Sequence, residues 1–126
     1  MLKLTTVFFL ITFSLLAVVH YLALQLFLYW KYWWFDIPMH FIGGAVVALG
    51  VFVLRDLRVL ARSAHLRFIP VLLAVCAVAI AWEVYEVLIG IPIEDDYVFD
   101  TTLDLCMGLL GGAVGYFVGV NLQKIT

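Results

Sequence analysis

Four long runs of hydrophobic residues, separated by short polar segments, dominate the pattern of the chain. They cover approximately residues 6–28, 37–54, 68–89 and 101–120. Each run is close to the roughly 20 residues that an α-helix needs to cross the hydrocarbon core of a bilayer. No segment of about ten residues alternates between hydrophobic and polar positions, as the strands of a membrane β-barrel do. The pattern predicts an all-α, integral membrane four-helix bundle, built as a single transmembrane domain over residues 1–126.

The composition agrees with a membrane protein and excludes several other classes. Of the 126 residues, 67% are hydrophobic and only 13% are charged, which no ordinary soluble domain shows. The chain has no basic arm or patch, so a nucleic-acid partner is not expected. The first hydrophobic run is too long for a signal peptide, and no small-residue cleavage motif follows it. The expected partner is membrane lipid, and homo-oligomerisation stays open.

Basic residues predict the orientation of the bundle. The segment between the second and third runs holds Arg55, Arg58, Arg62 and Arg67. Lys3 and Lys124 lie at the two ends of the chain, whereas the opposite side has only Lys31. Because cytoplasmic loops are rich in Lys and Arg, both termini are predicted to be cytoplasmic, and the acidic segment after the third run is predicted to face outward. The arginines also suit contacts with anionic lipid.

An aromatic segment, YWKYWWF, occupies Tyr29–Phe35 at the predicted outer surface. Such residues typically form a belt at the membrane interface, where their rings lie at the level of the headgroups. A platform on which a sugar stacks is the alternative interpretation.

Seven of the nine acidic residues lie between Trp82 and Asp104, and several fall inside the predicted spans. We take the outer boundary of the hydrocarbon core to lie near Phe35, Gly90 and Asp100. A helical rise of 1.5 Å per residue then places one layer of polar residues on the order of 5–10 Å below this boundary. The members of this layer are His40, Glu83, Glu86 and Asp104.

The spacing of these polar residues places them in pairs, each on one side of a helix. The pairs are Asp36 with His40, Glu83 with Glu86, and Asp100 with Asp104. A stripe of small residues then indicates which side packs inward. In the fourth run, Asp104 is followed at helical spacing by Gly108, Gly112, Gly115 and Gly119, a pattern typical of closely packed membrane helices. The carboxylates are therefore expected to point into the bundle, away from lipid. A weaker stripe in the first run brings His20 to the deeper edge of the layer.

Three sequence blocks in this order resemble the YjdF-like bacterial inner-membrane proteins. The blocks are Asp-x-x-x-His-Phe from Asp36, Trp-Glu-x-x-Glu from Trp82, and Asp-Thr-x-x-Asp from Asp100, the last followed by glycines. The resemblance covers approximately residues 35–116, and a remoter likeness is to VanZ-like membrane proteins. It implies a multi-pass protein of a prokaryotic inner membrane. It implies no reaction, because the family is of unknown function.

Unpaired carboxylates in a layer of low dielectric constant repel one another, so protons, cations or basic partners must neutralise them. A divalent metal ion would satisfy them together, and the predicted ligands are His40, Glu83, Glu86, Asp100 and Asp104. A mixed set of imidazole and carboxylates suits Zn, Mn or Fe, whereas an oxygen-only subset suits Mg or Ca. Asp36 is predicted to orient the His40 ring, and His20 and Thr101 are predicted to support the ligands without binding the ion.

Three functions stay open for this cluster. A metal-activated water beside a spare carboxylate would serve a hydrolase or transferase that acts on a lipid or cell-envelope substrate. Alternatively, the carboxylates are partly protonated and form a structural network of hydrogen bonds with His40, Thr101 and Tyr85. The third interpretation is a proton or cation pathway, which the apolar cytoplasmic half of the bundle disfavours.

Overall fold

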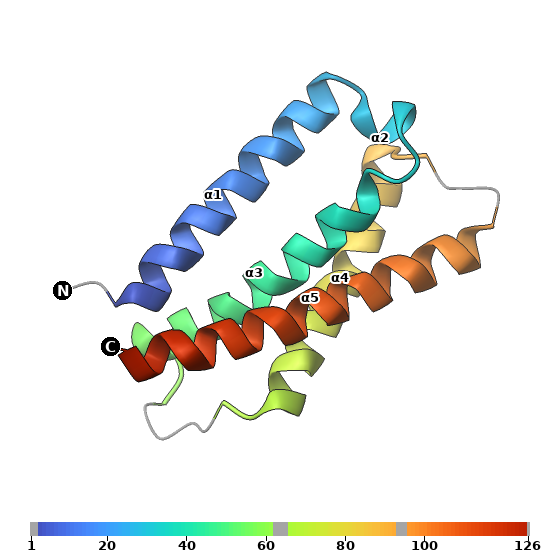
Figure 1. Ribbon diagram of the computed structural model, residues 1–126. Coiled ribbons are helices and arrows are strands. Elements are labelled where there is room, and N and C mark those ends of the chain that lie inside the picture. The colour runs from blue at the N-terminus through green and yellow to red at the C-terminus, as the bar shows by residue number, and fades with distance from the viewer. Residues whose placement is uncertain (1–2, 62–65, 93–95, 126) are drawn as a thin grey trace.

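The computed structural model describes residues 3–61, 66–92 and 96–125, and this part of the chain is helical, without strands (Figure 1). The helices are α1 (Leu4–Gln25), α2 (Leu28–Lys31), α3 (Asp36–Asp56), α4 (Phe68–Ile89) and α5 (Tyr97–Ile125). All except the short α2 are long and apolar enough to cross a membrane. The predicted all-α fold with four spans is confirmed, whereas the cytoplasmic position of the termini stays a prediction. Arg62, one of the residues behind that prediction, lies outside the described residues.

Helices α1 and α5 differ most from the predicted spans in the residues at which they begin and end. Helix α1 ends at Gln25, because Phe27 adopts a left-handed backbone conformation (φ 55°) that turns the chain into α2. Helix α5 begins before the predicted boundary at Asp100 and continues beyond residue 120. The Asp96 Oδ1 atom accepts a hydrogen bond from the Phe99 N–H at 3.1 Å, an arrangement typical of a helix N-cap. The polar residues near Asp100 therefore belong to the helix and not to the loop before it.

Helices α3 and α5 form the most extensive contact of the bundle and run side by side in the same direction (Figure 1). Glycines let their backbones approach closely. A Cβ atom added to Gly44 would overlap the Gly108 carbonyl oxygen, and one added to Gly111 would overlap the Phe41 carbonyl oxygen. The predicted inward orientation of the α5 glycine stripe is confirmed, and Gly111 joins it as a further buried member.

Helix α1 packs less tightly than the other long helices. Its only buried residues among those described are Thr5, Thr6 and Ala23. Near its start, Lys3 forms an ion pair of 2.7 Å with Asp56 of α3, and Gln123 of α5 donates a hydrogen bond of 3.3 Å to the same carboxylate. These contacts join three helices at the end of the bundle opposite to α2. The polar layer lies at the α2 end, where α3 and α5 begin and α4 ends.

Candidate metal centre

His40 lies at the centre of the polar layer and is 5% exposed. Its Nε2 atom faces three carboxylates: Asp36 Oδ1 at 3.5 Å, Glu83 Oε1 at 3.5 Å and Glu86 Oε1 at 3.7 Å. These separations are longer than ordinary hydrogen bonds, which reach about 3.2 Å. One imidazole nitrogen therefore faces carboxylates from two helices without closing a hydrogen bond to any of them.

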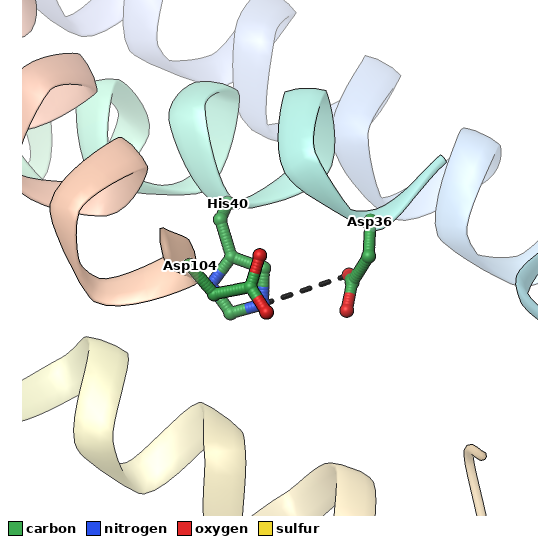
Figure 2. A group of neighbouring side chains, drawn as sticks. All are labelled: Asp36, His40 and Asp104. Carbon is green, nitrogen blue, oxygen red and sulfur yellow. Dashed lines mark ion pairs between the residues drawn. The ribbon is translucent and has the colours of Figure 1, made fainter. Parts of the chain in front are cut away.

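Asp104 approaches the same ring from α5 and is 2% exposed (Figure 2). Figure 2 shows Asp36 and His40 projecting from one side of α3, with the carboxylate of Asp104 beside the imidazole. Two sets of side chains in the structure have ligand atoms that all lie within 4.8 Å of one another. The first set is Asp36, His40 and Asp104, and the second is His40, Glu83 and Glu86. Both sets share His40, so the layer is one cluster.

Two hydrogen bonds fix the orientation of the glutamates. The Thr101 hydroxyl of α5 donates to Glu83 Oε2 at 3.1 Å, which leaves Glu83 Oε1 directed at His40. The Trp82 indole N–H donates to Glu86 Oε1 at 2.6 Å. Such supporting hydrogen bonds hold ligands in place at metal centres. The sequence already contained the signal for the second bond, because Trp82 and Glu86 are one helical turn apart.

Several buried atoms of the cluster have no hydrogen-bond partner among the described residues. They are His40 Nε2, Glu83 Oε1, Asp36 Oδ1 and Asp104 Oδ1. Buried polar atoms are nearly always paired in folded proteins, so each exception calls for a physical explanation. Because all four belong to one cluster, a single bound species could satisfy them together.

A chain of aromatic and imidazole groups adjoins the cluster. His20 of α1 is hydrogen-bonded through Nδ1 to the Tyr29 hydroxyl at 2.8 Å and through Nε2 to the Tyr85 hydroxyl at 3.2 Å. Its ring also packs edge-on against Trp82, with 5.0 Å between the ring centroids. His20 thus adjoins the cluster through Trp82, the donor to Glu86.

Tyr29 is a site residue that the sequence interpretation missed. It lies within the aromatic segment that is predicted to form a belt at the membrane interface, yet it is only 7% exposed. Burial, helped by the carboxylates of Asp36 and Glu86, raises the pKa of the Tyr29 hydroxyl, so the phenol stays neutral. The neighbouring Trp33 and Trp34 remain exposed, as a belt in contact with lipid requires. No feature of the segment distinguishes Tyr29 from these neighbours.

The structure brings together four of the five predicted ligands, namely His40, Glu83, Glu86 and Asp104. Asp100 lies one turn before Asp104 and belongs to neither set of clustered ligand atoms. The role predicted for Asp36, to orient the His40 ring, stays a prediction. A group that orients a ligating imidazole bonds the ring nitrogen that does not face the metal. Asp36 lies 3.5 Å from Nε2, the nitrogen that also faces both glutamates.

Comparison with known proteins gives a family for the chain. The family described as "Predicted membrane protein (DUF2238)" matches residues 1–124. The chain belongs to the DUF2238 family. YjdF-like proteins are members of this family, so the resemblance of the three sequence blocks is confirmed. No curated protein and no solved structure matches the chain.

The three blocks of this DUF2238 chain come from three different helices. The Asp36 block opens α3, the Trp82 block lies in the last turns of α4, and the Asp100 block lies in the first turns of α5. All three converge on His40. The family match extends beyond these blocks to include α1, which contributes His20 to the surroundings of the cluster.

Proposed function

We propose that the cluster around His40 binds a divalent metal ion, with His40 Nε2, Glu83 Oε1 and Glu86 Oε1 as ligands. The separations between these atoms carry the proposal. Ligand atoms about 2.1 Å from a tetrahedrally coordinated ion lie about 3.4 Å from one another. The Nε2 atom lies 3.5 Å from the Glu83 oxygen and 3.7 Å from the Glu86 oxygen. The Nε2 atom is thus too far from either oxygen for a hydrogen bond, and each separation suits two ligands of a shared ion.

The charges of the cluster support a cation. Four carboxylates, from Asp36, Glu83, Glu86 and Asp104, surround one imidazole. When the carboxylates are ionised, even a positively charged imidazole leaves three negative charges uncompensated. The ion pairs of the described residues give these four carboxylates only His40 as a basic partner, whereas Lys3 pairs with Asp56 at the other end of the bundle. Burial of unpaired charges is costly, and a divalent ion would remove most of this imbalance.

The ligand types favour a transition metal ion. Imidazole is a preferred ligand of Zn and Fe, whereas Mg and Ca are bound mainly by oxygen atoms. We therefore expect Zn²⁺ or a similar ion at His40.

The cluster contains more carboxylates than the ion requires, which suits hydrolysis. Catalytic zinc sites use three protein ligands and leave the fourth position to water. With His40, Glu83 and Glu86 as ligands, Asp36 and Asp104 remain beside that position. Either carboxylate could take a proton from a water molecule whose acidity the ion has raised. The function that this arrangement supports best is metal-dependent hydrolysis or group transfer on a lipid or cell-envelope substrate.

Elemental analysis of the purified protein tests the metal site. We expect close to one transition metal ion per chain, and a loss of that ion in His40→Ala and Glu83→Gln. Asp56→Asn is the matched control, because it also replaces a buried carboxylate but lies outside the cluster. A protein that takes up no divalent ion, even after incubation with Zn²⁺, Mn²⁺ or Fe²⁺, would leave the cluster as a structural network of hydrogen bonds and reject the proposal.

The proposed location is the outer half of a prokaryotic inner membrane. It rests on the arginine-rich segment between α3 and α4, which favours a cytoplasmic position for that end of the bundle. A reporter enzyme that is active only outside the cytoplasm should be inactive after insertion near Ser63 and active after insertion near Asp95. The opposite result would place the cluster on the cytoplasmic side.

A further inference from the structure

An apolar cavity of about 200 Å³ adjoins the cluster. His40 and Trp82 contribute to its wall at the polar layer, and Gly43, Val47 and Val75 line its deeper part. Apart from His40 and the indole of Trp82, its lining residues are aliphatic, glycine, Met39 or the aromatic Phe13. The cavity therefore leads from a polar cluster into the hydrophobic part of the bundle.

Two residues of the cavity lining are exposed on the outside of the bundle, one on α1 and one on α4. Phe13 of α1 and Val78 of α4 both belong to the lining, and they are 50% and 45% exposed, respectively. In a spanning bundle, the exterior at this depth is the hydrocarbon of the bilayer. A lipid molecule could thus reach His40 sideways from the membrane.

The dimensions of the cavity restrict what can occupy it. Its lining on α3 extends from Met39 to Val47, a separation of about 12 Å at 1.5 Å per residue. A cavity of about 150 Å³ holds one benzene molecule, so this cavity has room for roughly eight carbon atoms. It is too small for a helix, whose diameter with side chains is about 10 Å. A single extended hydrocarbon chain meets these limits.

We propose that the cavity binds the part of a phospholipid acyl chain nearest its ester, with the ester toward His40 and the rest of the chain in the bilayer. This assignment rests on the proposed metal site. It identifies acylated membrane lipids as the substrate class of that site. An acyl chain gains little by exchanging bilayer hydrocarbon for an apolar cavity, because both surroundings are equally dry. The preference of the lipid for the cavity then comes from its polar end, which lies against the polar cluster at His40.

The fluorescence of Trp82 gives a direct test, because this residue lines the cavity. The other three tryptophans, Trp30, Trp33 and Trp34, are exposed and can be replaced with Phe to leave Trp82 as the only reporter. This protein would be placed in vesicles of phosphatidylcholine whose acyl chains carry bromine, which quenches tryptophan on contact. We expect stronger quenching by bromine near the middle of the chain than by bromine near its terminal methyl group.

Gly43→Leu separates chains in the cavity from chains on the outer surface. A Cβ atom at Gly43 meets no atom within 4 Å, so the new side chain can enter the cavity without displacing the backbone. We expect this variant to lose most of the quenching while it keeps its metal ion. Ala81→Leu is the matched control, because Ala81 is exposed on α4 and is not part of the cavity wall. Its quenching should equal that of the parent protein.

Equal quenching in the parent protein and in Gly43→Leu would overturn the acyl-chain site, whatever the metal content. A change of the same size in Ala81→Leu would also overturn it, because the quenching would then report surface lipid. Absence of metal from all samples would instead reject the proposed function and, with it, the role of the lipid as a substrate. The two failures are distinguishable because one is read from fluorescence and the other from elemental analysis.

Discussion

Replacement of Glu83 by Gln distinguishes a metal centre from a structural network through the sign of its effect on stability. The substitution removes the charge of the atom that faces His40 at 3.5 Å. The amide of glutamine keeps an oxygen that can still accept the hydrogen bond from Thr101. The shape and packing of the side chain are nearly unchanged, so the experiment isolates the carboxylate charge.

The expected magnitude follows from the linkage between ion binding and folding. An ion that binds only the folded state stabilises it by about 2.7 kcal/mol at a free concentration one hundred times Kd. Loss of a group that supports a ligand typically weakens metal binding about 10- to 100-fold, and loss of a ligand should cost at least as much. At the same ion concentration, Glu83→Gln should therefore lose about 2 kcal/mol of the stabilisation that the ion provides.

Thermal unfolding in detergent, measured both with Zn²⁺ and with a chelator, gives the required comparison. With Zn²⁺ the variant should unfold at a lower temperature than the parent protein. With the chelator it should be equally or more stable, because one of several mutually repelling carboxylates has been removed. Asp56→Asn should show the same difference from the parent in both conditions. If the effect of Glu83→Gln is the same with and without the ion, the reasoning is refuted.

Two further predictions use neighbouring residues as controls. Thr101→Val removes the hydroxyl that holds Glu83 and should weaken zinc binding about 10-fold or more in a competition titration with a chelator. Thr102→Val is the control and should leave zinc binding unchanged, because the Thr102 hydroxyl donates to a backbone carbonyl of its own helix. A zinc affinity that is equal in the two variants would exclude Thr101 from the site. Gly44→Ala should lower the free energy of unfolding in detergent by about 1–3 kcal/mol, because the methyl group overlaps the α5 backbone. The methyl group of Gly43→Ala meets open space, so this variant should have nearly the stability of the parent protein. Equal effects of the two alanines would contradict the close contact of α3 and α5.

The sequence predicted those features that depend on helical periodicity. Hydrophobic runs located the four long helices, and the rise per residue placed His40, Glu83, Glu86 and Asp104 in one layer. The glycine stripe identified the inward face of α5. These predictions succeed because a membrane helix is regular and must satisfy its backbone hydrogen bonds internally.

Features that depend on side-chain rotamers and irregular backbone were not predicted. The break at Phe27 turns Tyr29 into the bundle, yet nothing in a run of aromatic residues indicates a left-handed residue. The ring nitrogen of His40 that Asp36 faces depends on the side-chain torsion angles of both residues, which spacing does not determine. Asp100 shares the face of Asp104 but lies one turn farther out, and the predicted layer was too coarse to separate them.

The contact between Gly44 and Gly108 also determines how the chain tolerates insertions and deletions. His40 precedes Gly44 by four residues, and Asp104 precedes Gly108 by four residues on a helix that runs in the same direction. Equal offsets from one contact place the two side chains opposite each other, one turn beyond it. Loss or gain of a single residue in either interval would rotate that side chain about 100° around its helix, because a helical turn has 3.6 residues. An insertion or a deletion would therefore separate His40 from Asp104 even if every glycine and every acidic residue were retained. The length of these two intervals is itself a requirement of the site.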